Sequence, residues 1–170
     1  GVIQKKVAEM ASYFGIHTWF RKNVYELSGG QKQILNLASV MVMQPRVLLL
    51  DEPTSQLDPI MASEFIATLV KLNRELGTTI ILSEHRLEEL FPVADRILVM
   101  SDGRADIFDS ARNAGKYLSG GPNRHEMYYG MPAIMKIYTE LRDAEVQEGD
   151  CPVTVKEGRR WLSSLLGGQI

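Results

Sequence analysis

The chain has 170 residues, of which 45% are hydrophobic and 24% are charged, a balance that is typical of globular proteins and excludes a disordered chain. The formal net charge of -2 is too small to indicate a nucleic-acid binder or a polybasic membrane-surface protein. A single cysteine, Cys151, excludes an intrachain disulfide, and apolar runs such as Val47–Leu50 are too short to cross a bilayer.

The first elements are predicted from hydrophobic periodicity. Apolar residues recur at helical spacing over residues 3–14, and Gly15 follows as a helix end. Residues 16–27 are expected to form a loop with short helical pieces. A second helix is expected from Gly30 or Gln31 to about residue 43, because Pro45 cannot continue it.

A strand, a helix and a strand follow. The unbroken apolar run Val47–Leu50 predicts a strand that is buried on both faces, as in a parallel sheet. Asp58-Pro59 marks the start of the next helix, which Gly77 ends. Residues 78–82 are β-branched and apolar, and they predict the second strand.

A short helix over residues 86–91 and a hairpin complete this region of the chain. The hairpin strands, residues 96–100 and 105–108, flank the turn signal Ser101-Asp102-Gly103. The order of these elements predicts an α/β fold, with a parallel sheet flanked by helices and an added hairpin.

The composition changes after Phe108. Residues 111–122 are rich in small side chains, helices are expected over residues 132–141 and 156–166, and residues 145–152 form an acidic loop. We therefore expect two regions, residues 1–110 and residues 111–170. The second region would be a helical accessory or linker region.

A glycine-containing motif, Leu27-Ser28-Gly29-Gly30-Gln31, stands at the start of the second predicted helix. Glycines let a ligand approach the backbone, and a helix N-terminus offers free N–H groups to a phosphate. The alternative is an ordinary flexible turn. Ser119-Gly120-Gly121 has the same three residues, but Pro122 follows it and no polar motif forms.

Two acids, Asp51 and Glu52, directly follow the first predicted strand. Open α/β sheets bind ligands at this end of their strands. One acid can hold Mg²⁺ through water while its neighbour orients the attacking water. The alternative is a solvated acidic loop.

His85 lies just beyond the second predicted strand, one strand-helix-strand unit after Asp51. This spacing would bring His85 to the same sheet edge as the two acids, where it could contact a γ-phosphate. A helix-capping or surface histidine is the alternative, and it is the more common role of an isolated histidine.

Four ordered motifs resemble those of ABC ATPases. Residues 27–31 resemble the signature motif, residues 47–52 the Walker B strand, residues 55–58 the D-loop and residues 83–85 the H-loop. The resemblance implies the C-terminal portion of a P-loop NTPase-like ABC ATPase domain. In such proteins two domains enclose two ATP molecules, and the signature of one domain faces the Walker A loop of the other.

The resemblance also implies roles for single residues. Ser28, Gly29 and Gly30 would touch the γ-phosphate of ATP held by a partner domain. Gln31 would complete that signature, and Asp58 would communicate across the dimer.

In the chain's own domain, the resemblance assigns Asp51 to Mg²⁺ and Glu52 to catalysis, as the base or water-positioning residue. His85 would contact the γ-phosphate. ATP and Mg²⁺ are the implied cofactors.

Two departures from the family pattern concern the phosphate loop and the signature helix. No Gly-x-x-x-x-Gly-Lys-Ser/Thr occurs, since the one Gly-Lys pair, Gly115-Lys116, precedes Tyr117, and Ile34 stands where the family usually has arginine. We expect that the N-terminal portion of the domain has been removed from this chain, and that the isolated chain is inactive. The arginine replacement is expected to alter helix packing or a salt link more than chemistry.

Within the family, three segments resemble in sequence the tandem ATPases of the energy-coupling-factor class: residues 51–59, 84–89 and 151–161. The resemblance implies an ATPase subunit of an importer for a vitamin, cobalt or a related small nutrient. It would be cytoplasmic, peripheral at the inner face of the cell membrane.

The partners implied are a second ABC ATPase domain (as homodimer, heterodimer or tandem) and membrane-embedded transporter subunits, with no nucleic acid. Two alternatives remain open: a soluble ABC ATPase of translation or DNA repair, and a non-catalytic interaction module.

Overall fold

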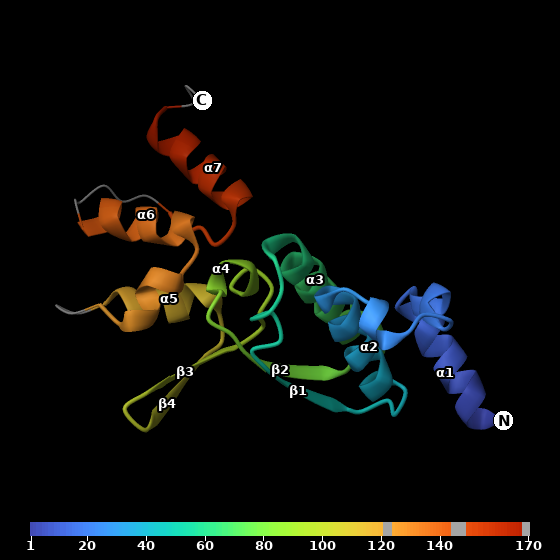
Figure 1. Ribbon diagram of the computed structural model, residues 1–170. Coiled ribbons are helices and arrows are strands. Elements are labelled where there is room, and N and C mark those ends of the chain that lie inside the picture. The colour runs from blue at the N-terminus through green and yellow to red at the C-terminus, as the bar shows by residue number, and fades with distance from the viewer. Residues whose placement is uncertain (121–123, 144–148, 168–170) are drawn as a thin grey trace. The chain divides into compact units, whose positions relative to one another are not determined.

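The computed structural model describes residues 1–120, 124–143 and 149–167 (Figure 1). The chain forms two compact units, Gly1–Glu84 and His85–Ile170. The division falls inside the region predicted over residues 1–110, and the predicted domain boundary after residue 110 stays a prediction.

The first unit combines helices with two strands. Its α-helices are α1 (Val2–Tyr13), α2 (Gly29–Met41) and α3 (Pro59–Leu76), its strands are β1 (Val47–Asp51) and β2 (Thr79–Ser83), and its short 3-10 helices are η1 (Ile16–Trp19) and η2 (Val24–Glu26).

The strands β1 and β2 lie side by side and run parallel (Figure 1). Their register pairs Val47 with Thr79 at one end and Asp51 with Ser83 at the other. The helix α3 connects them, because parallel strands need a crossover rather than a tight turn. This unit confirms the predicted α/β class.

Local signals explain the bounds of α3. The Asp58 side chain caps its start, Pro59 occupies the first helical position, and Gly77 ends it with a φ of 66° in the left-handed region. Leu72 of this helix is fully buried, whereas Leu76 in its last turn is 44% exposed.

The prediction that the first strand is buried on both faces is wrong for this structure. Leu48 is 5% exposed, whereas Leu49 is 74% exposed and Ile81, its partner in the register, is 52% exposed. Successive strand residues point to opposite faces of a sheet, and here only the Leu48 face meets a core.

In its described residues, the second unit combines the hairpin with α-helices and a short 3-10 helix. Its elements are α4 (Leu87–Leu90), β3 (Ile97–Ser101), β4 (Arg104–Phe108), α5 (Ala111–Ser119), η3 (Glu126–Gly130), α6 (Ala133–Asp143) and α7 (Val155–Leu165).

The hairpin confirms its predicted turn. Ser101 pairs with Arg104 in the antiparallel register, so Asp102 and Gly103 form a two-residue loop. Their φ angles of 51° and 73° are both positive, as a type I′ turn requires.

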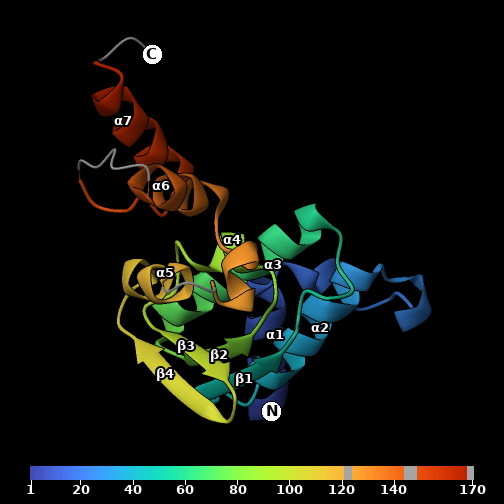
Figure 2. The same ribbon diagram turned by 90° about the vertical axis from the view of Figure 1, so that its left-hand side faces the viewer.

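Helix α5 was not expected from the small residues of segment 111–122. Ser110 caps this helix, and Gly115 is small because a Cβ there would lie 2.3 Å from the Met135 methyl carbon. Figure 2 shows α5, α6 and α7 following one another in chain order. Ser119 ends α5, while Gly121 and Pro122, and residues 145–148 of the acidic loop, lie outside the described residues.

One hydrophobic core unites the second unit from the hairpin to α7. It includes Val99 of β3, Leu118 of α5, Met135 of α6 and Trp161 of α7. No helix in the three described stretches of the chain is long and apolar enough to span a bilayer.

Candidate active site

The acid pair stands at the carboxyl end of β1, where the register sets Asp51 opposite Ser83. The Ser83 hydroxyl donates to Asp51 Oδ1 over 2.5 Å. The Glu52 N–H lies 3.1 Å from the Ser83 carbonyl and 3.3 Å from the Ser83 hydroxyl, which both accept from it. One serine therefore positions both acids, and both carboxylates belong to exposed residues.

Glu52 adopts an unusual backbone conformation, with a φ of 42°. A residue with a side chain seldom occupies this left-handed region, because its Cβ crowds the following carbonyl. Such a conformation persists only where neighbouring interactions maintain it, and it is frequent at active sites.

The turn after the acid pair is tied to the residue that follows β2. Thr54 is 3% exposed, and its N–H and hydroxyl donate to the same Glu84 oxygen over 2.8 and 2.6 Å. Inside the turn, Ser55 N–H donates to the Glu52 carbonyl and Leu57 N–H to the Thr54 carbonyl.

The motif at residues 28–31 forms the first turn of α2. Ser28 and Gln31 make a capping box, in which Ser28 Oγ accepts from Gln31 N–H and Gln31 Oε1 accepts from Ser28 N–H. The first N–H groups of a helix have no acceptor within it. After the box is closed, the N–H groups of Gly29 and Gly30 remain for a ligand.

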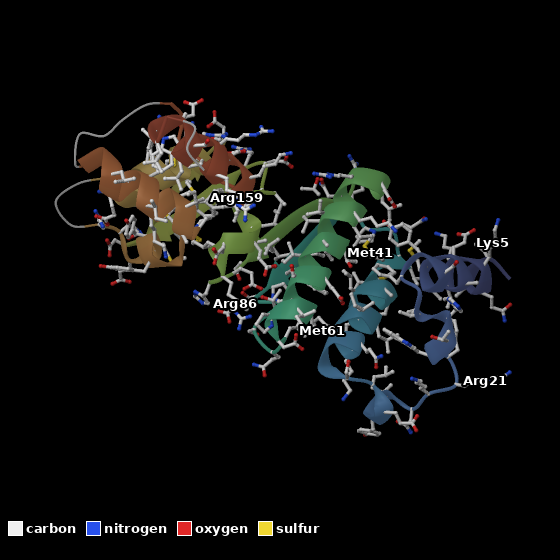
Figure 3. All side chains as sticks on the ribbon, turned by 90° about the horizontal axis from the view of Figure 1, so that it is seen from above. Lys5, Arg21, Met41, Met61, Arg86 and Arg159 are labelled. Atoms are coloured by element: carbon white, nitrogen blue, oxygen red, sulfur yellow. The ribbon has the colours of Figure 1, made fainter. Side chains whose placement is uncertain are left out.

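The start of α2 lies against the segment that leads into α3. A Cβ at Gly30 would collide with Met61, and a Cβ at Gly29 would lie 4.0 Å from the Gln56 carbonyl. Gln33 Nε2 donates to the Pro53 carbonyl over 3.1 Å. The structure thus brings the signature-like motif and the D-loop-like segment together within one unit. Figure 3 marks Met61 on α3 and Met41 on α2.

Asp58 serves the structure as a helix cap. Its Oδ1 accepts from Ile60 N–H and Met61 N–H, each over 3.0 Å. Its expected role in communication across a dimer stays a prediction.

His85 begins the second compact unit and is exposed. The residue that the register sets opposite Asp51 is Ser83, two positions earlier. The γ-phosphate contact assigned to His85 stays a prediction.

Ile34, which replaces the family's usual arginine, packs on a small cluster formed by Ala11, Ile16 and Ala38. The residue therefore contributes to the packing of α1 against α2, and the expected effect of replacing the arginine stays a prediction.

Four residues near the acids were not singled out from the sequence: Gln33, Thr54, Ser83 and Glu84. Their contacts depend on strand register and helix packing, which the order of motifs does not encode. The strands predicted from the sequence, Val47–Leu50 and residues 78–82, differ in length and gave no signal that would have placed Ser83 opposite Asp51.

The donor set at the acid pair suits Mg²⁺ bound together with a substrate. Mg²⁺ keeps several waters and takes one or two carboxylates plus phosphate oxygens. Asp51 supplies one exposed carboxylate, oriented by Ser83. In the described stretches no three His, Cys, Asp or Glu side chains gather as a metal cage, so the remaining ligands would come from water and phosphate.

Fold and site together define an α/β domain with two exposed acids at the carboxyl end of a parallel strand, and comparisons with known proteins give its family. The ABC transporter family profile matches residues 2–55. A protein of Bacillus thuringiensis subsp. konkukian named as an ABC transporter ATP-binding protein is 57% identical over 164 residues. A second, from Bacillus anthracis, is 41% identical over 165 residues.

These two relatives align with 96% and 97% of this chain, and the chain spans 28% of the length of each. Among solved structures, cbiO1 of Clostridium perfringens, part of the transporter complex cbiONQ, matches 83% of this chain and 51% of its own. Its TM-score is 0.63, with 32% identity. An ATP-binding cassette of an ABC transporter, in its ADP conformation, shares the fold with a TM-score of 0.67 at 23% identity. The match covers 76% of this chain and 51% of the cassette chain. The chain belongs to the ATP-binding domains of ABC transporters.

Proposed function

We propose that the protein containing this chain hydrolyses ATP at a site that it shares with a second ABC ATPase domain, and that hydrolysis powers import of a small nutrient. The observation that carries this proposal is the acid pair at the end of β1. Asp51 and Glu52 are both oriented by Ser83 and both exposed to an incoming ligand.

Phosphoryl transfer depends mainly on positioning and on stabilising charge. Asp51 holds Mg²⁺, which supplies charge neutralisation for the phosphate oxygens when it is bound. Glu52 orients and polarises the attacking water. His85 contacts the γ-phosphate from the same domain.

The second half of the site comes from a partner domain. Gly29 and Gly30 present first-turn N–H groups, and Ser28 keeps its hydroxyl proton because its oxygen acts as the acceptor in the cap. Such groups suit the γ-phosphate of ATP bound to the partner. Gln31 holds the cap closed, and Asp58 transmits the state of one site to the other.

The importer class is proposed from two supports. The sequences of residues 51–59 and 84–89 resemble those of energy-coupling-factor ATPases. In addition, cbiO1, which belongs to a transporter complex, is 32% identical to this chain. The nutrient would be a vitamin, cobalt or a related small solute. The protein would lie at the inner face of the cell membrane, bound to membrane-embedded subunits.

Residues 1–170 by themselves should not turn ATP over, because they contain no Gly-x-x-x-x-Gly-Lys-Ser/Thr loop to hold the β- and γ-phosphates. A steady-state assay of the isolated chain tests this. Turnover near ~1 s⁻¹, the low end for kinases that transfer a phosphoryl group, would contradict it.

The decisive experiment is Glu52→Gln in the intact protein. The amide keeps the shape of the side chain but cannot act as an anionic base, so single-turnover hydrolysis should fall at least ~100-fold while ATP binding is kept. Glu64→Gln, at an exposed position of α3, is the matched control. Hydrolysis by Glu52→Gln close to wild type would overturn the assignment. Loss of cobalt or vitamin uptake by the same variant in cells would support the importer class.

A further inference from the structure

Three consecutive residues after β1 are held by contacts from β2, from α2 and from Glu84, the residue that follows β2. The Glu52 N–H donates to Ser83, the Pro53 carbonyl accepts from Gln33 of α2, and Thr54 donates twice to Glu84. The short segment 52–54 therefore has its position fixed from β2 and from the signature helix at once.

The contacts at Thr54 are the strongest of this set. Both Thr54 donors converge on one oxygen of an acidic side chain, over 2.8 and 2.6 Å. Hydrogen bonds to an ionised carboxylate are roughly twice as strong as those between neutral groups. Thr54 is only 3% exposed, so water competes poorly for its hydroxyl.

The backbone of Glu52 needs such support. Its φ of 42° lies in the left-handed region, which disfavours any residue that has a Cβ. Without contacts on both sides, the peptide could relax to an ordinary conformation and redirect the Glu52 side chain. Ser83 holds the N-terminal side of this strained residue, and Glu84, through Thr54, holds the C-terminal side.

We propose that Glu84 is a positioning residue for Glu52: by binding both Thr54 donors, its carboxylate fixes the turn that holds the Glu52 backbone in its left-handed conformation after β1. The inference rests on the proposed ATPase function and adds a residue that determines the position of the proposed catalytic glutamate. Glu84 does not touch the reacting atoms and acts through Thr54 alone.

The test measures steady-state ATP hydrolysis by the intact protein with its membrane partners. Glu84→Ala should lower kcat about 10- to 100-fold and leave the KM for ATP within about threefold, because nucleotide contacts are unchanged. Glu84→Gln, whose amide oxygen accepts without charge, should lose about 3- to 10-fold. Thr54→Val should lose a similar factor, and Thr54→Ser should restore kcat to within about twofold.

Coupling between the two residues gives a readout that a general loss of stability would not. Glu84→Ala combined with Thr54→Val should be no slower than Glu84→Ala alone, because the hydroxyl contact that Thr54→Val removes is already lost in Glu84→Ala. Thr68→Val is the matched control, since the Thr68 hydroxyl donates to the Glu64 carbonyl within its own helix, α3. It should leave kcat unchanged.

If Glu84→Ala fails to fold, Thr54→Val and Glu84→Gln decide the matter. A kcat within about twofold of wild type for Glu84→Gln and Thr54→Val, or multiplicative losses in the double variant, would overturn the role of Glu84. Glu52→Gln in the same preparation separates the two proposals. If Glu52→Gln abolishes hydrolysis while the Glu84 and Thr54 variants are active, only the positioning role fails. If Glu52→Gln hydrolyses ATP normally, the proposed function fails and the positioning role with it.

Discussion

Gly30 of α2 and Met61 of α3 approach so closely that a Cβ at Gly30 would lie 2.2 Å from the Met61 methyl carbon. The same Cβ would lie 3.3 and 3.4 Å from Met61 Cγ and Cβ. The methyl end of methionine can rotate away, but the atoms near the backbone cannot. Helix packing alone therefore favours a glycine at the second glycine position of the motif, whether or not a phosphate binds there.

Gly30→Ala is expected to destabilise the protein by about 1 kcal/mol. Overpacking costs about 1–3 kcal/mol, and about 1 kcal/mol of it is offset because alanine favours helix more than glycine. Urea unfolding checks this, with Gly29→Ala as control, since its Cβ would meet only the Gln56 carbonyl at 4.0 Å. Equal stability of the two variants would contradict the packing argument.

Gly158 of α7 is also closely approached by a side chain of a neighbouring helix, that of Ile134, which is stiffer than methionine. A Cβ there would lie 2.3 and 2.4 Å from the Cγ1 and Cδ1 atoms of Ile134 on α6. Ile134 is β-branched and rotates with difficulty, so Gly158→Ala should cost more than Gly30→Ala, about 2–3 kcal/mol. In an Ile134→Ala background the added cost should nearly vanish, which a double-mutant cycle by urea unfolding measures. Simple addition of the two effects would refute the contact.

The elements predicted correctly are those with local signals. The start of α3 follows from Asp58-Pro59, its end from Gly77, and the hairpin from Asp102-Gly103. Helix α5 was not predicted, because Gly115 and the Ser-Gly-Gly-Pro sequence at its end favour loops, although its alanines favour helix. Gly115 is small so that Met135 can approach, and this reason exists only in the folded structure.

The candidate site, like the fold, could be predicted from the sequence only in part. The position of Asp51 and Glu52 at the end of a parallel strand follows from the apolar run before them. The contact of Ser83 with Asp51 needs the register, and that of Thr54 with Glu84 needs the conformation of a turn. Glu52 has a positive φ, which no sequence rule predicts for a glutamate.

Asp58 allows its structural and functional roles to be separated. Asp58→Ala removes the acceptor of two N–H groups, and should cost about 1 kcal/mol of unfolding free energy. Asp58→Asn keeps the cap and loses only the charge, so its stability should stay within about 0.5 kcal/mol of wild type. If the charge acts across the dimer, Asp58→Asn should still lower ATP hydrolysis by the intact protein. Unfolding and ATPase measurements on both variants decide, and an equal loss of stability would rule out the capping role.

The raised pKa of Tyr13, in α1, leads us to expect a loss of stability at high pH. Burial, and then the neighbouring Glu75 carboxylate of α3, raise the pKa of the Tyr13 hydroxyl to about 12 from its usual 10.0. Lys71 of the same helix lies 4.6 Å from the centre of the Tyr13 ring. The folded protein therefore holds this proton more tightly than the unfolded chain does.

The sign of the pH dependence follows from this difference. The stabilisation is complete below about pH 10, where both states are protonated, and it is lost as the pH rises toward 12. Tyr13→Phe should flatten the fall in unfolding free energy between these pH values. Glu75→Gln should flatten it only partially, because burial is the larger cause. Urea unfolding at several pH values from 9 to 12, with absorbance titration of tyrosinate, measures both effects. A steeper fall for Tyr13→Phe than for wild type would show that the folded state does not favour the protonated hydroxyl.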